Sequence, residues 1–292
     1  MLDLLTLAPL TFLFINSFKS QTEIVDNPLA LPVNWTLDYL FNAAQTIQFP
    51  KALALTALIT VLSVGLLVFI SSFVAWMMVR AKSTASKGLY MAFAAAMLIP
   101  FQSVMYPLID LFDRMNLKNI LGLIIMYCGF GMCMSVFMYH GFIKNIPFSL
   151  DEAAVIDGAN IFQLFFRVVF PLLRTTSITV IIINTMWIWN DYLLPYLVIG
   201  NAEDKTLTLK LYYAKQIVSQ YGNLWELIFP AVLISILPIV ILFLFLQKQV
   251  MSGMTDGAVK GESYLYNIRS VLNGKNLVER KCGISNLSAQ LL

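Results

Sequence analysis

The residues with the most distinctive spacing lie in a stretch, 139–176, that is too apolar for a solvated linker and too interrupted for a membrane span. Ser149 followed three residues later by Glu152 has the spacing of a capping box at a helix start. Asp151 and Glu152 place acid in the first turn, where the helix dipole favours it. Gly158 can end this helix. A short face of small residues results, formed by Leu150, Ala153, Ala154 and Asp157.

A second amphipathic piece follows Gly158. Pro147 lies before the first piece and Pro171 after the second. Its apolar residues are Ile161, Phe162, Leu164, Phe165, Phe166, Val168 and Val169. Two short helices with an apolar face and a small, flat face favour a docking surface, whose chemistry is noncovalent. The alternative is an interfacial helix that lies on lipid headgroups. That alternative explains the phenylalanines but not the spacing of Glu152, the two alanines and the glycine.

Polar side chains inside apolar segments form the second candidate group, because polar residues are costly in a membrane and suggest function. Asn184, Trp187 and Asp191 are spaced i, i+3 and i+7, which places them on one helix face. Their amide and aromatic groups suit a hydroxylated ligand. Hydrogen bonds between helices, or anchoring at the membrane interface, explain the same residues as well. The candidates for lining a substrate path are Gln102, Ser103, Asn184, Trp187, Asn190 and Asp191.

Catalytic and metal chemistry find little support among the remaining residues. His140 is the single histidine and has no evident ligand partner. The cysteines Cys128, Cys133 and Cys282 show no zinc-type spacing and are expected to be packing residues. The chain also lacks the glycine-rich phosphate loop of ATPases. We therefore expect no catalytic residue, no metal site and no cofactor on this chain.

Composition indicates an integral membrane protein of 292 residues. Hydrophobic residues make up 59% and charged residues 12%, against about 45–50% and about 25% in a typical soluble domain. This excludes a cytosolic enzyme, a secreted domain and a disordered scaffold. The net charge of +3 is too small to suggest nucleic-acid binding.

Five runs have the roughly 20 apolar residues that a spanning helix requires. A sixth run, 4–18, is shorter; we interpret it as a first span that is short or truncated in this sequence, because a signal peptide would have a basic start and a clear cleavage site. The sequence thus predicts an all-α, polytopic membrane protein with six transmembrane helices. Gly129, Gly131, Ala92 and Ala96 are expected at close helix contacts. The five longer spans are 52–79, 88–108, 120–138, 177–199 and 224–246.

Basic residues indicate the orientation. The segments 80–87, 139–176 and 247–292 hold twelve Lys and Arg, whereas 18–51, 109–119 and 200–223 hold seven. Basic residues close to a span are the most reliable indicators. When only these are counted, the first set holds eight Lys and Arg and the second set seven. The positive-inside rule therefore places the first set, and both termini, in the cytoplasm.

The spacing within 152–171 resembles the EAA loop of ABC importer permeases. That pattern is E-A-A, three residues, G, nine residues, I, one residue, L-P. Glu152, Ala153, Ala154, Gly158 and Pro171 match it. The two conservative departures are Val168 and Phe170.

The rest of the chain is similar to one branch of that family, the six-span permeases of the maltose and multiple-sugar importers. The similar segments are 16–19, 32–39, 189–195 and 247–261, so the likeness covers about 1–261. A short basic lead at the N-terminus, usual in that branch, is missing. The polar tail 262–292 extends past where such permeases normally stop, and no role is assigned to it.

The resemblance implies a bacterial cytoplasmic-membrane permease subunit that imports a carbohydrate. It implies a transmembrane domain at 1–261, with its core at about 52–250. It also implies four partners: two cytoplasmic ATPase subunits that bind ATP and Mg²⁺, a second permease and an extracytoplasmic solute-binding protein. The coupling residues by this likeness are Ser149, Asp151, Glu152, Ala153, Ala154, Asp157, Gly158 and Pro171.

A self-sufficient secondary transporter is the alternative reading of the same spans. That class often shows internal repeats and charged residues within the membrane. The chain has no clear repeat, and acidic residues deep in its predicted spans are scarce. A membrane-embedded enzyme would need clustered catalytic groups, which are not evident.

Overall fold

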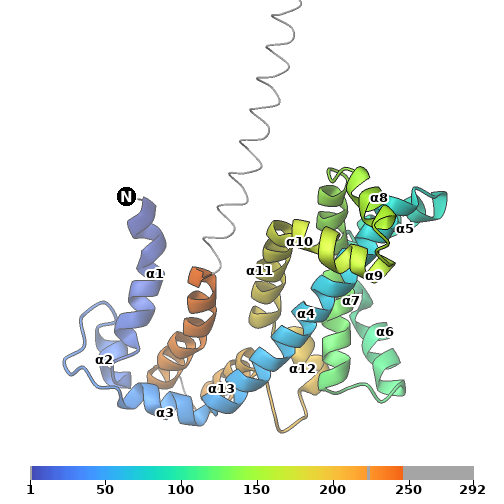
Figure 1. Cartoon of the computed structure of the whole chain (residues 1–292). Helices are drawn as coiled ribbons and strands as arrows, with labels where there is room; N and C mark the ends of the chain where they lie inside the picture. Colours follow the sequence, from blue (N-terminus) through green and yellow to red (C-terminus); the bar gives the residue numbers. More distant parts are fainter. Residues whose placement is uncertain (1, 222–223, 246–292) are drawn as a thin grey trace, which may run out of the picture. The chain divides into compact units, whose positions relative to one another are not determined.

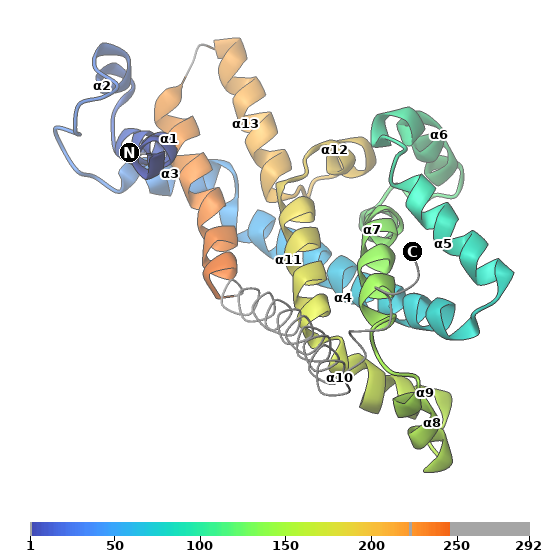
Figure 2. The same cartoon turned by 90° about the horizontal axis from the view of Figure 1, so that it is seen from above.

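The computed structural model describes residues 2–221 and 224–245, and these residues form helices and no strand (Figures 1 and 2). The sequence positions 246–292, including the segment near Gly253 and the tail 262–292, lie outside the described residues. The first helices are α1 Leu2–Asn16, α2 Gln21–Asp26, α3 Asp38–Thr46, α4 Phe49–Ala81, α5 Thr84–Ala96, α6 Phe101–Arg114 and α7 Ile120–Ile143. They are followed by α8 Ser149–Ile156, α9 Ile161–Gln163, the π-helix η1 Leu164–Val169, α10 Phe170–Leu172, α11 Arg174–Asn190, α12 Leu193–Ile199, α13 Leu207–Tyr221 and a last helix, Trp225–Phe245.

Three described helices are long and apolar enough to cross a membrane: α4, α7 and Trp225–Phe245. They correspond to the predicted spans 52–79, 120–138 and 224–246, although residue 246 itself is not described. Two bent helix pairs are, each taken together, also long and apolar enough to cross a membrane. The number of candidate spans rises to five if each pair is one span. A shorter apolar helix, Leu7–Asn16, lies where the short first span is predicted.

The predicted span 88–108 is not one continuous helix, because α5 and α6 meet at an angle of 105°. Pro100 lies directly before α6 in an extended conformation, with φ −67° and ψ 140°. Proline donates no backbone hydrogen bond, and its ring disfavours helical geometry in the residue before it. The chain therefore leaves α5 after Ala96 and begins a new helix at Phe101.

The predicted span 177–199 is also interrupted. α11 ends at Asn190, and Asp191 is extended, with φ −77° and ψ 129°. The side chain of Asp191 accepts a hydrogen bond from the backbone N–H of Leu193 at 2.9 Å, at the start of α12. A short acidic side chain that caps a new helix competes with continuation of the old one. At its other end, α11 is preceded by the segment Ile161–Leu172, bent from it by 77°.

The core forms where α4, α7 and α11 pack together (Figure 2). Leu67 of α4 and Val180 of α11 are fully buried, as are Leu123 and Val136 of α7. At Gly131 the helices approach so closely that an added Cβ would lie 2.1 Å from Cδ1 of Leu67. The expectation of close packing is thus confirmed at Gly131, whereas a Cβ at Gly129 would meet nothing within 4 Å.

The N-terminal helices pack against the last described helix. Phe12 of α1 makes an edge-to-face contact with Phe229, with ring centroids 5.7 Å apart. The backbone N–H of Gln21 donates to Glu226 at 2.9 Å, and the backbone N–H of Trp225 donates to the side chain of Gln21 at 2.6 Å. These contacts join the two ends of the described chain.

Candidate functional site

The start of α8 differs from the predicted capping box. Phe148 precedes the helix in a helical conformation, and its carbonyl accepts from the backbone N–H groups of Asp151 and Glu152. Ser149 is therefore the first residue inside the helix, where its hydroxyl makes no cap. The chain already turns at Pro147, whose carbonyl accepts from the N–H of Leu150 at 3.3 Å. A capping serine must stand one residue earlier, in an extended conformation.

The end of α8 confirms the prediction for Gly158. This residue has φ +82°, a left-handed conformation that favours glycine. The N–H of Ala159 donates to the carbonyl of Ala154, and the N–H of Gly158 donates to that of Val155, both at 3.0 Å. This pair of bonds is a Schellman motif, which satisfies the last carbonyls of a helix and turns the chain sharply.

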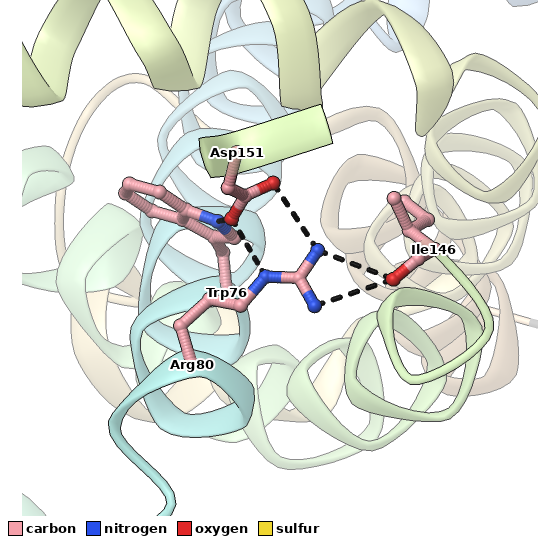
Figure 3. A network of polar contacts seen from close by, with 4 residues as sticks. All are labelled: Trp76, Arg80, Ile146 and Asp151. Carbon is pink, nitrogen blue, oxygen red and sulfur yellow. Dashed lines mark hydrogen bonds and ion pairs between the residues drawn. The ribbon is translucent and has the colours of Figure 1, made fainter. Parts of the chain in front are cut away.

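Asp151 is the buried anchor of α8, with 4% of its surface exposed (Figure 3). Nε of Arg80 donates to its Oδ2 at 2.7 Å, and Nη2 donates to its Oδ1 at 3.3 Å. The indole Nε1 of Trp76 donates to the same Oδ2 at 3.2 Å. Nη1 and Nη2 of Arg80 also donate to the backbone carbonyl of Ile146, each at 3.3 Å.

This network joins three parts of the chain. Trp76 and Arg80 belong to the last turns of α4, Ile146 to the turn after α7, and Asp151 to the first turn of α8. The charged side chains are 14% and 6% exposed, so water screens their attraction little. A planar guanidinium that holds a carboxylate and a carbonyl at once fixes the orientation of α8 relative to α4.

The phenylalanines after Gly158 also pack on α4. Phe165 is fully buried, with its ring 5.0 Å from Phe73 and 5.4 Å from Trp76. Phe166 stacks on Phe69 at 5.8 Å with an interplanar angle of 8°. Leu164, Phe165 and Val169 are therefore buried in the core, whereas Ile161, Phe162 and Phe166 are exposed.

The opposite side of α8 is exposed. Glu152, Ala153, Asp157 and Gly158 are exposed, and Ala154 is half-buried. Glu152 makes no ion pair with any residue that the structure describes. Ser149 is exposed at the start of α8, and Pro171 is exposed at the start of α10. A cavity of about 870 Å³ adjoins α8, with walls that include Met77, Glu152, Val155, Ile156 and Ile161.

The candidate path residues separate into four groups. Asn184 is buried, and its Nδ2 donates to Oγ of Ser135 on α7 at 3.2 Å, which is a bond between helices. Gln102 and Ser103 are exposed on α6, and no hydrogen bond in the described part of the chain joins them to α11. Asn190 lines a cavity of about 250 Å³ together with Tyr192, Thr208 and Tyr212.

Trp187 and Asp191 meet on one residue of α7. The hydroxyl of Tyr127 donates to Oδ2 of Asp191 at 3.1 Å, and its ring is edge-to-face with Trp187 at 5.5 Å. Because Asp191 lies beyond the last turn of α11, the expected common helix face does not extend to it. Both nevertheless reach the same tyrosine.

Sequence reasoning missed Arg80 and Trp76 as site residues. They lie 71 and 75 positions from Asp151, and no local spacing connects them. In the sequence Arg80 counts only among the basic residues of the segment 80–87. Tyr127 and Tyr212 were missed for the same reason, since each meets its partner from a separate helix.

Several apolar helices and a firmly anchored loop between two of them define a multi-pass membrane component. The chain belongs to the family described as binding-protein-dependent transport system inner membrane component, whose model matches residues 67–255. The match confirms the resemblance to importer permeases that the sequence indicates. It also identifies a transport component of the inner membrane rather than an enzyme.

Curated relatives cover nearly the whole chain. A probable starch degradation products transport system permease protein, AmyC of Thermoanaerobacterium thermosulfurigenes, is 42% identical over 89% of this chain and 93% of its own length. The multiple sugar-binding transport system permease protein MsmG of Streptococcus mutans is 32% identical over 88% and 93%. The melibiose/raffinose/stachyose import permease protein MelC of Bacillus subtilis is 35% identical over 87% and 91%.

A solved structure shares the fold. A chain of a bacterial ABC transporter involved in the import of the acidic polysaccharide alginate superposes with a TM-score of 0.72. The match covers 85% of this chain and 91% of that one, at 19% sequence identity.

Proposed function

We propose that this chain is the permease subunit of an ATP-driven importer that moves a carbohydrate across the bacterial cytoplasmic membrane. The family match and the names of the relatives support this function. The observation that carries the coupling part is the anchoring of α8: its inner face is fixed to α4 by Asp151 and Arg80, while Glu152 on its outer face has no ion-pair partner in the described residues.

In this proposal α8 is the coupling helix of an EAA loop and docks in a groove of a cytoplasmic ATPase subunit. Ala153 and Ala154 permit close approach, and Glu152 pairs with a basic residue of the ATPase. Ser149 and Asp157 border the contact, while Gly158 and Pro171 set the bends that follow. ATP and Mg²⁺ are bound by two such ATPase subunits, and this chain holds no cofactor.

Movement of the ATPases reaches the membrane through the anchored loop. When the subunits close on ATP, α8 moves with them. The ion pair between Asp151 and Arg80 carries the displacement into α4, which packs along α7 and α11. A rigid-body shift of these helices then switches the path between inward-facing and outward-facing states.

The path for the sugar would run beside a second permease and receive its cargo from an extracytoplasmic solute-binding protein. Asn190, Trp187 and Asp191 are the path residues that the structure best supports, since Asn190 lines a cavity and the other two meet Tyr127. Gln102, Ser103 and Asn184 are the other candidates, and all six residues stay predictions. Aromatic rings with neighbouring amide and hydroxyl groups suit hydroxylated rings.

Six spans and two cytoplasmic termini complete the proposal. They require α1 to cross as a short span and each bent helix pair to cross once. The transmembrane domain would then occupy 1–261, with the core at about 52–250 and a polar tail at 262–292.

Affinity purification of the tagged full chain from native membranes in mild detergent tests this function. We expect a P-loop ATPase and a second permease among the co-purified proteins identified by mass spectrometry. Glu152→Ala should weaken recovery of the ATPase, whereas Glu203→Ala, which removes an exposed acid from another loop, should not. A chain that purifies alone, or whose partners are indifferent to Glu152→Ala, contradicts the coupling proposal.

A further inference from the structure

A second cavity, of about 940 Å³, opens at the ends of α4, α5 and α7. Its wall contains four basic side chains and no carboxylate, so it is a basic pocket. The basic residues are Arg80, Lys82, Lys87 and Lys144.

Three of these charges are not neutralised by the protein. Arg80 is paired with Asp151, but Lys82, Lys87 and Lys144 form no ion pair with the residues that the structure describes. Lys82 lies over the ring of Phe148 at 5.4 Å. Lysines gathered around one cavity repel each other, and an anion among them would relieve that repulsion.

The wall also holds an unsatisfied polar group. His140 is 7% exposed and stacks on Tyr90 with ring centroids 3.9 Å apart. Its Nδ1 is buried and has no hydrogen-bond partner among the residues that the structure describes. Lys144 lies over the other partner of this stack, with Nζ 5.8 Å from the ring centroid of Tyr90. His140 therefore adds a further polar group to a cavity wall that also holds the basic side chains.

Much of the rest of the wall is apolar, and it also holds the polar residues Ser83, Ser86 and Asn145. Met78 and Val79 lie near the end of the apolar helix α4, and Met91 of α5 is exposed. α5 has no buried residue, and its Leu89 is also exposed. A ligand that fills this pocket thus meets cations at one side and hydrocarbon-compatible side chains at the other.

We propose that this basic pocket binds the phosphodiester headgroup of an anionic phospholipid. Free phosphate also offers negative charge and oxygen acceptors, but the apolar part of the wall and the exposed apolar residues of α5 favour a ligand that carries acyl chains. Basic pockets between spanning helices at the cytoplasmic side are suited to anionic headgroups. The inference goes beyond the coupling proposal and does not depend on the ATPase contact.

The test uses the full chain in the complex in which it purifies, reconstituted in nanodiscs that contain phosphatidylglycerol in phosphatidylcholine. Native mass spectrometry after release from the discs counts retained lipids. Lys87→Ala with Lys144→Ala should weaken phosphatidylglycerol retention on the order of tenfold. The matched double variant Lys51→Ala with Lys118→Ala, which removes two exposed cations elsewhere, should retain the lipid as the unaltered chain does.

Two further experiments distinguish a lipid headgroup from a soluble phosphate and provide a result that does not depend on the folding of the variants. Millimolar inorganic phosphate should not displace phosphatidylglycerol; displacement would overturn the lipid assignment in favour of a soluble anion. A photoreactive phosphatidylglycerol on the unaltered chain should crosslink within 78–91 or 140–148. Equal lipid retention in both double variants, or crosslinks confined to an ATPase that covers the pocket, would overturn the proposal.

Discussion

Arg80 and Asp151 lie 71 positions apart in the sequence and form an ion pair of 2.7 Å between α4 and α8. The same guanidinium donates to the carbonyl of Ile146, so one side chain holds both the turn before α8 and the first turn of α8 (Figure 3). The ion pair thus fixes the first turn of α8 to the last turns of α4.

Removing one partner of this pair should cost stability. Asp151→Ala leaves the buried guanidinium of Arg80 uncompensated, and we expect a loss of about 3 kcal/mol in unfolding free energy. Denaturation of the detergent-solubilised chain, followed by tryptophan fluorescence, measures it. The double variant Arg80→Met, Asp151→Leu should recover much of this stability, because it leaves no unpaired charge. Strictly additive losses in the double variant would contradict a direct interaction.

Glu152 should behave differently from its neighbour. Because it is exposed and has no ion-pair partner among the described residues, Glu152→Ala should change the unfolding free energy by no more than about 0.5 kcal/mol. Its expected effect is a loss of carbohydrate-stimulated ATP hydrolysis and uptake in the reconstituted complex. Glu203→Ala serves as the control, as its side chain is 95% exposed in another loop. Full uptake by Glu152→Ala would refute its role in docking.

Any side chain at position 158 should destabilise the protein because of the backbone conformation alone. A Cβ there meets nothing within 4 Å, yet φ is +82°. Gly158→Ala should therefore cost about 1 kcal/mol from left-handed strain and loosen the turn after α8. Gly141→Ala is the matched control, since a Cβ there also meets nothing within 4 Å and the residue lies inside α7. Equal unfolding midpoints for the two variants would exclude a strained turn.

Alanine substitutions at Gly131 and Gly129 distinguish the effect of close packing from the effect of helix propensity. An added Cβ at Gly131 would lie 2.1 Å from Leu67 Cδ1 and 2.7 Å from Asn184 Oδ1. Gly131→Ala should therefore destabilise the fold by about 1–3 kcal/mol through overpacking. Gly129→Ala should be neutral or stabilising, because alanine favours a helix over glycine by up to about 1 kcal/mol. Thermal unfolding of both variants measures the difference, and a reversed order would contradict the close approach of the three helices.

Local properties of the chain determined much of the fold. The apolar runs 52–79 and 120–138 are long enough to predict α4 and α7, because length and hydrophobicity are properties of a single segment. Gly158 ends α8 as its neighbours indicate, since a helix C-terminus is decided within one turn. The spacing from Glu152 to Pro171 likewise identified the family without any tertiary contact.

Tertiary structure decided which residues meet. The partners of Asp151 come from α4, and Asp191 reaches Tyr127 of α7, because both contacts depend on how separate helices pack. The bend at Pro100 and the break at Asp191 interrupt segments whose hydropathy alone predicts continuous spans. Ser149 shows the same limit on a smaller scale, since the turn at Pro147 places it one residue inside the helix that it was expected to cap. Hydropathy and local spacing report on one segment at a time, whereas the contacts that fix this site join segments brought together only by folding.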